Sequence, residues 1–517
     1  MNKKFLNKLS VLAISSALFA VSCTDLEIDE TDSVFSEGTG PFSGVTNAEA
    51  SLTQLYNDIY GQLGNQENEF ALHEVSTDEL LVPTRGTDWG DNGIWRTLHA
   101  HTWTPAHLFV LRSWNNQNQN VFRATEIIDP LSNPAPQVEA EARFLRAFSM
   151  YQVMDLFGQV PFREASEGPE IDPRVLTRAE AYDFIVNDLT TALPNLPTRG
   201  PSAETNLASK ATANFLLAKL YINAHIYKGT GTPDSADMQA VIDAVDAIEA
   251  DGYGLASGYF DIFKEDVDTE TIWWLRTSVG NKIWNGMHYN IISPDNTGGG
   301  WNGFTTLAEF YDLFEGDANS NAVGSGQEER RGFVPDATNA DASNLGIGYG
   351  FLLGQQYDVD GNPLTDRIGG PLSFTRELPG LIGNNEITGI RVIKYHPVNG
   401  AFTPHLIEFR YADALLMKAE AQFNAGIGDP LALVNQLRGI RGAAPLGSLT
   451  ALDILDERGR ELYIERWRRN DLIRFGEFTK DWPFKEPSSV GDVNRNLFPI
   501  PSNALLSNPN LTQNPGY

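Results

Sequence analysis

Residues 136–157 have the sequence PQVEAEARFLRAFSMYQVMDLF, and this stretch decides the fold class. Its apolar positions recur at spacings of three and four, which places one set of side chains on a single helical face: Ala140, Phe144, Ala147, Tyr151 and Met154. Gly158 and Pro161 end the pattern. A long helix with an apolar face buries it against other helices, so the stretch predicts a helical core.

More helices are expected on both sides of this stretch. Apolar periodicity predicts them at about residues 47–61, 106–128, 208–225, 412–423, 430–441 and 452–468. Another begins near Thr177, an expected N-cap with Glu180 three residues later, as in a capping box. Small residues mixed with large ones suit closely packed helical hairpins that resemble tetratricopeptide repeats, although no repeat of about 34 residues is clean. The predicted fold class is mainly α.

The texture of the chain changes between about residues 255 and 405. Gly, Asn, Asp and Pro interrupt short runs such as 271–275 and 390–395, which predicts loops with a few strands. We expect a single domain over residues 45–517. Its helical body would comprise about 45–255 and 405–517. The loop-rich part at about 255–405 is either a second lobe or a long excursion that carries function. The tail at 496–517 is expected to wrap over the helical body.

The N-terminus predicts export and lipid attachment. A basic head and an apolar run are typical of a secretory signal peptide over residues 1–22. The run ends in AVSC at Cys23, the only cysteine, and this context resembles a bacterial lipobox, in which the cysteine is acylated. An ordinary signal peptide with an incidental cysteine is the alternative. Residues 23–44 are polar, acidic and Gly-containing, and we expect them to form a flexible lipidated tether.

The formal net charge of −29 narrows the choice of partners. Nucleic acid is excluded, because phosphates need basic contacts. Peripheral binding to anionic membranes is disfavoured for the same reason. The charge also favours a neutral ligand over an anionic one.

Several segments of this chain resemble the SusD/RagB family. They are EARFLRAF with LFGQVPF at 141–148 and 156–162, RYADALLMKAEA at 410–421, DERGRELYIERWRRNDLIRFG at 456–476, and FPIP with NPNLTQNPGY at 498–501 and 508–517. With the lipobox, they cover the chain in the order that the family shows. The resemblance implies a helical body of four tetratricopeptide-like helix pairs. It also implies that the variable loop-rich lobe at about 255–405, with its short strands, carries the ligand site.

The resemblance also implies a function. A family member is expected on the surface of the outer membrane of a Bacteroidetes cell, held there by lipid at Cys23. It would capture an oligo- or polysaccharide, a neutral glycan such as a glucan being favoured, and deliver it to a TonB-dependent transporter of the SusC type. The alternative is a structural lid of the transporter, or a peptide-binding relative, without a glycan site.

Sugar binding without chemistry needs exposed aromatic faces and planar hydrogen-bonding groups. Trp89 lies among Gly, Asp and Asn, a composition typical of a surface loop, and Trp95 would form a second wall. Trp301 follows three glycines, and Trp284 lies among asparagines. The expected glycan-binding residues are therefore Trp89, Trp95, Trp301, Trp284, Asp78, Arg85 and Asn92. The alternative for the first two is packing beneath the loop.

Catalytic and metal-binding patterns are missing from the sequence. It has no nucleophile elbow, HExxH or P-loop, and nothing singles out the carboxylate pair of a glycoside hydrolase. We expect neither enzymatic activity nor a cofactor. His99, His101 and His107 lack an acidic third ligand, and residues 358–362 favour a turn over a calcium loop, so no metal site is expected.

Charged residues in the family-like segments are expected to be structural. They are read as ion pairs between packed helices, costly to break but not reactive. The residues concerned are Arg410, Asp413, Arg460, Glu461, Arg466 and Asp471.

Overall fold

The computed structural model describes residues 41–517 apart from 202–203, 265–267, 277–286, 288–299, 337, 340–347, 359 and 396–404. The signal peptide, Cys23, most of the tether and Trp284 therefore lie outside the described residues. Residues 43–517 form one compact unit. Among the described residues, no helix combines the length and apolarity needed to cross a membrane.

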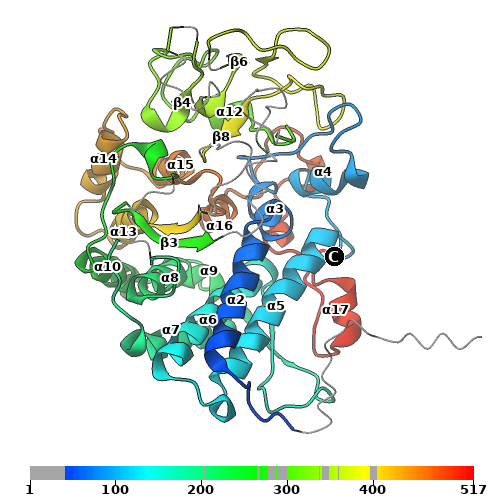
Figure 1. The fold of residues 1–517 in the computed structure, drawn as a ribbon, viewed down its shortest axis with the longest axis vertical. Helices are drawn as coiled ribbons and strands as arrows, with labels where there is room; N and C mark the ends of the chain where they lie inside the picture. The colour runs from blue at the N-terminus through cyan, green and yellow to red at the C-terminus, as the bar shows by residue number, and fades with distance from the viewer. Residues whose placement is uncertain are drawn as a thin grey trace, which may run out of the picture. The chain divides into compact units, whose positions relative to one another are not determined.

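Helices from the first half of the chain build most of the body. They are α2 (Ala48–Leu63), α3 (Glu69–Glu74), α4 (Ile94–His99), α5 (Leu108–Ile128), α6 (Pro136–Phe157), α7 (Arg178–Ala192), α8 (Lys210–Ile222), α9 (Ala224–Tyr227) and α10 (Ser235–Ala250). Helix α6 packs between α5 and α7, and α10 packs against α8 (Figure 1). The predicted mainly α class is confirmed.

Local sequence explains where these helices begin and end. In α6 the predicted apolar face is buried. Gly158 ends the helix, with a φ of 73° in the left-handed region. Thr177 caps α7 by accepting a hydrogen bond from the Glu180 amide, and the Glu180 carboxylate accepts one from the Thr177 amide. The predicted capping box is confirmed.

The C-terminal helices are α13 (Tyr411–Ala425), α14 (Pro430–Ile440), α15 (Ala451–Leu462), α16 (Arg468–Arg474) and α17 (Ser502–Ser507). The single helix predicted at 452–468 is wrong, because the chain turns between α15 and α16. Ile464 and Arg466 have φ of 63° and 68° there. Their amides donate to the buried carboxylates of Glu79 and Glu74, contacts from the far end of the chain that hold the turn.

The strands are short. Strand β3 (Thr271–Arg276) pairs with β9 (His405–Arg410), so the second part of the predicted helical body begins with a strand. Strands β4 (Gly332–Phe333), β5 (Tyr349–Leu352) and β8 (Arg391–Ile393) form a three-stranded sheet in that order. The remaining pairs are β1 (Val160–Phe162) with β2 (Arg174–Leu176), and β6 (Gly354–Gln355) with β7 (Ser373–Phe374). In Figure 1, β4, β6 and β8 lie with α12 (Ala308–Tyr311) at the end away from α6 and α7.

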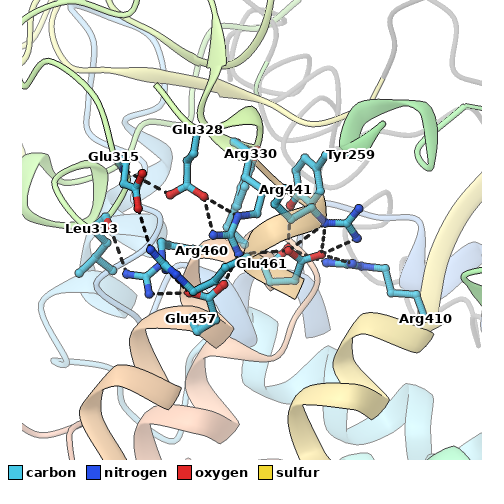
Figure 2. Close-up of polar contacts among 12 residues, drawn as sticks. Tyr259, Leu313, Glu315, Glu328, Arg330, Arg410, Arg441, Glu457, Arg460 and Glu461 are labelled. Carbon is cyan, nitrogen blue, oxygen red and sulfur yellow. Dashed lines mark hydrogen bonds and ion pairs between the residues drawn. The ribbon is translucent and has the colours of Figure 1, made fainter. Parts of the chain in front are cut away.

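A buried ionic cluster joins the helical body to this lobe. Figure 2 shows Glu461 beside Arg330, Arg410 and Arg441, and Glu457 beside Arg330 and Arg460. The charged residues predicted as scaffold all form ion pairs, and their side chains are at most 10% exposed, which confirms the predicted pairing. The pair of Arg460 with Glu457 lies within α15 and not between two helices.

The C-terminal tail lies over the helical body as predicted. The Phe498 amide donates to the Leu156 carbonyl, and the Asn514 side chain donates to the Phe157 carbonyl. Trp103 donates from Nε1 to the Tyr517 hydroxyl at 2.6 Å. These contacts tie the last residue of the chain to the core.

Candidate functional site

A pocket of about 260 Å³ lies in the loop-rich lobe where segments 85–89, 301–302, 366–368 and 385–386 meet. We call it the Trp89–Trp301 pocket. It brings together three of the residues predicted for ligand binding: Trp89, Trp301 and Arg85. Trp301 lies more than 200 positions after Arg85 and Trp89 in the sequence, so the fold brings it to the other two.

The loop carrying Trp89 is tightly held. The backbones of Arg85 and Asp88 exchange two hydrogen bonds, and the Gly86 amide donates to the Asn384 carbonyl. Trp89 itself has φ of 59°, a conformation that is rare for a bulky side chain and is kept only where surrounding contacts enforce it. The loop is therefore fixed in one shape before any ligand arrives.

The two tryptophans of the pocket play different parts. The Trp89 ring is partly buried edge-on against Trp95 and Phe304, and its Nε1 donates to the Trp301 carbonyl at 2.9 Å. Trp301 is 45% exposed. Trp89 thus anchors the backbone from which the Trp301 ring extends, and the exposed indole offers a flat apolar face for stacking.

Gly303 allows this arrangement because it lies directly beneath Trp89. A Cβ at position 303 would come within 2.3 Å of the Trp89 ring carbons. No side chain fits there unless the indole moves.

Gly303→Ala is therefore expected to displace Trp89 and weaken the binding of a ligand in this pocket about tenfold, equivalent to about 1.4 kcal/mol. Gly90→Ala is the matched control, since its Cβ would meet nothing within 4 Å and its φ is −70°. Isothermal titration of the two variants with the same ligand measures the difference. Equal affinities would show that the position of Trp89 does not matter.

Two arginines behind the pocket hold its walls. Arg85 donates from Nε to the Gly303 carbonyl and from Nη1 to the carbonyls of Asn385 and Thr388. Arg391 donates from Nε to Asn302 Oδ1 at 2.5 Å, and from Nη2 to the Glu386 carbonyl. Burial lowers the pKa of Arg85 to about 9 and also lowers the pKa of Arg391.

Charges at the rim of the pocket are paired with each other. Arg367 lies 3.0 Å from the Asp88 carboxylate and 3.9 Å from that of Glu386. Asp366 accepts hydrogen bonds from the Ile368 and Gly370 amides. The rim therefore carries both hydrogen-bond donors and hydrogen-bond acceptors. Such a rim suits a neutral ligand with many hydroxyls.

Other predicted site residues lie elsewhere. The prediction that Trp95 forms a second exposed wall is wrong, because this residue is only 2% exposed and its Nε1 donates to Asp91. Asp78 forms a two-pronged ion pair with Arg468 at 2.8 Å and does not line the pocket. Asn92 is exposed in the loop but is also absent from the lining. Trp284 lies outside the described residues.

The sequence analysis missed four further lining residues of the pocket, which are Asp366, Arg367, Asn385 and Glu386. These residues lie in turns that look like many other polar turns of the lobe. The only available signal was their place in a long Gly-rich excursion, which marks the region but not the residues.

The three histidines considered as metal ligands donate hydrogen bonds to backbone carbonyls. His99 donates from Nε2 to the Pro483 carbonyl, His101 to Ser76 and His107 to Ile94. Asp358 accepts from the amides of Asp360 and Asn362, as in a turn. Among the described residues, no three His, Cys, Asp or Glu side chains are grouped so that they could hold a metal ion.

Comparisons with known proteins agree with this architecture. A family described as the SusD family matches residues 394–517, and one described as starch-binding associating with outer membrane matches residues 30–222. The Starch-binding protein SusD of Bacteroides thetaiotaomicron is 26% identical, with 88% of this chain and 86% of that protein aligned.

Solved structures share the fold. A laminarin binding SusD-like protein superposes with a TM-score of 0.64 at 21% identity, covering 92% of this chain and 100% of that one. Surface glycan-binding protein A from Bacteroides thetaiotaomicron, in complex with laminarihexaose, superposes with a TM-score of 0.66 at 18% identity, covering 90% of this chain and 98% of that one.

Proposed function

Because this chain belongs to the SusD family, we propose that it captures a neutral oligo- or polysaccharide in the Trp89–Trp301 pocket. The observation that carries the proposal is the exposed Trp301 indole, whose backbone is fixed by Trp89 above a rim of paired charges. Stacking on the indole would orient a sugar ring, and the rim groups would bind its hydroxyls.

A glucan is the favoured ligand. The curated relative is named for starch, and two structural neighbours are named for laminarin or bound to laminarihexaose. These ligands are uncharged, which suits a rim whose arginine is already paired with carboxylates. The proposed mode is binding without chemical conversion.

Capture would serve uptake. In this proposal, acylation of Cys23 anchors the protein on the cell surface at the outer membrane, and a SusC-like TonB-dependent transporter receives the glycan. Binding to a surface-anchored protein raises the local concentration of ligand at the transporter, so even moderate affinity is sufficient.

Affinity electrophoresis of the full chain without its signal peptide tests the proposal. The gels contain laminarin, soluble starch, xylan, mannan or an anionic polysaccharide. We expect a neutral glucan to retard the native protein and Trp301→Ala to lose most of that retardation, while its circular dichroism spectrum stays unchanged.

The other outcomes decide between the alternatives. Unchanged retardation of Trp301→Ala would move the site away from this pocket. Retardation by the anionic polymer alone would contradict the argument from paired charges. No retardation by any polymer would favour a structural lid or a peptide-binding protein.

A further inference from the structure

A second concave site lies at the β4 edge of the three-stranded sheet. It has a volume of about 450 Å³ and shares no lining residue with the Trp89–Trp301 pocket. Three partly exposed aromatic rings line it: Phe260, Phe333 and Tyr349. We call it the Phe333 pocket.

The three rings form a continuous aromatic surface. Phe333 of β4 and Tyr349 of β5 are direct cross-strand partners, with ring centroids 6.1 Å apart at 63°. Phe260 reaches Tyr349 from the short helical turn Tyr259–Asp261, with centroids 5.2 Å apart at 33°. Partly exposed rings grouped in a hollow are unusual on a surface that serves no partner, because apolar area facing water is costly.

The carboxylates around the rings already have partners within the protein. Asp261 pairs with Lys264, and the buried Glu328 pairs with Arg330. Glu329 accepts a hydrogen bond from the Tyr259 amide at 2.8 Å. A site for a cationic ligand would be expected to present unpaired carboxylates beside its rings. The pairing here favours a neutral ligand, as in the Trp89–Trp301 pocket.

The walls of the Phe333 pocket are anchored in the ionic core. Glu328 lines the pocket and accepts a hydrogen bond from Arg330, and Arg330 also donates to Glu457 at 2.7 Å (Figure 2). The Tyr259 hydroxyl donates to the Glu461 carbonyl at 2.6 Å. A wall held by buried ion pairs loses little conformational freedom when a ligand binds.

We propose that the Phe333 pocket is an accessory binding site for a neutral oligosaccharide. The class of ligand rests on the proposed function, whereas the site itself rests on its own rings and paired charges. Two sites on one lobe would let a single long polymer engage both. Its release would then be slower than from either site alone.

Isothermal titration with hexasaccharides from laminarin, starch, xylan and mannan tests the proposal on the full chain without its signal peptide. We expect two molecules of the recognised hexasaccharide to bind each native chain. One molecule should bind Phe333→Ala and one should bind Trp301→Ala. On gels containing the parent polymer, each single variant should bind about tenfold more weakly, and the double variant should not be retarded.

Two further variants separate a loss of binding from a loss of folding. Val323→Arg places a large charged side chain at a 48% exposed position in the lining, so it should block the pocket without removing a packed ring. Val493→Ala, at a 68% exposed position outside both pockets, should bind two molecules like the native chain.

Each result has a separate meaning. One molecule per native chain, with all binding lost in Trp301→Ala, would overturn the accessory site and leave the proposed function standing. Binding kept in Trp301→Ala but lost in Phe333→Ala and Val323→Arg would support this site and move the main function to it. No binding by any hexasaccharide to the native chain would overturn both.

Discussion

Replacing Glu461 by Gln is expected to lower the free energy of unfolding by about 3–5 kcal/mol, the usual result of removing one partner from a buried ion cluster. Its carboxylate accepts hydrogen bonds from Arg410 at 2.6 Å, Arg441 at 3.0 Å and Arg330 at 3.2 Å. All four side chains are inaccessible to solvent. The amide keeps the shape but leaves positive charge in the interior without its counter-charge.

The ionisation state of Glu461 supports the same expectation. The surrounding arginines outweigh desolvation and hold its pKa well below the usual range, so the carboxylate is charged at neutral pH. A lowered carboxyl pKa stabilises the folded state above the pKa of the unfolded chain and loses this contribution only in acid. The substitution should therefore have its full effect at pH 7.

Urea unfolding at pH 7, followed by circular dichroism, measures the loss. The matched control is Glu377→Gln, because Glu377 also pairs with an arginine, Arg376, but its side chain is 75% exposed. Removing a surface pair of this kind is expected to cost less than about 1 kcal/mol. If both variants lost the same small amount, the buried cluster would not be a major support of the fold.

Helices were predictable where burial repeats along the chain. In α6 and α13 the apolar face has a clear period of three and four, and Gly158 and Gly426 mark the ends. Helix α10 was missed, although its buried residues have the same spacing: Met238, Val241, Ile242, Val245 and Ile248. Small alanines lie between its larger apolar residues, so the buried face is clear only when the spacing is counted.

The break between α15 and α16 could not be predicted in this way. The pattern of 452–468 is helical, yet Ile464 and Arg466 take left-handed conformations. Glu79 and Glu74 accept hydrogen bonds from their amides across almost 400 residues. Local propensity is weak beside a buried contact of this kind, and sequence periodicity carries no trace of it.

The sequence predicted the loops of the site but not the direction of each side chain in them. Gly, Asp and Asn around Trp89 and Trp301 indicated surface loops, and both loops do line the pocket. The same loop composition suggested that Trp95 would be exposed. However, Trp95 lies in the first turn of α4, and its ring packs inward against Phe109 and Phe304. Composition identifies a loop, but the direction of each side chain depends on packing.

Buried histidines should make the protein sensitive to mild acid. His99 is fully buried and donates to the Pro483 carbonyl, and burial lowers its pKa to about 4. The pKa of His73 and that of His405 are also lowered to about 4, mainly by burial. In an unfolded chain the pKa of histidine is about 6.5. Between pH 6.5 and 4 the unfolded state therefore binds more protons, and stability is lost as the pH falls.

Other groups change the pH dependence of stability in the opposite direction. The contribution of one histidine is therefore best measured as the difference between the native chain and a variant without it. Burial raises the pKa of Glu69, Glu74 and Glu79, and such carboxyls stabilise the folded state as they gain protons in acid. His99→Gln leaves these groups in place. Its side-chain amide can donate to the Pro483 carbonyl as the imidazole does, but it binds no proton.

Urea unfolding of the native chain and of His99→Gln at pH 7, 6, 5 and 4.5 gives the comparison. We expect the native chain to lose about 2 kcal/mol more than the variant between pH 7 and pH 4.5, because one proton costs about 1.4 kcal/mol per pH unit across the shifted range. The positive charge of the nearby Lys485 contributes to the lowered pKa, so protonation of His99 is opposed by both burial and repulsion. Parallel stability curves for the two proteins would mean that the imidazole is protonated in the folded state as readily as in the unfolded chain. In that case water or a local opening must reach His99, and its side chain would not be shut off from solvent as the structure shows.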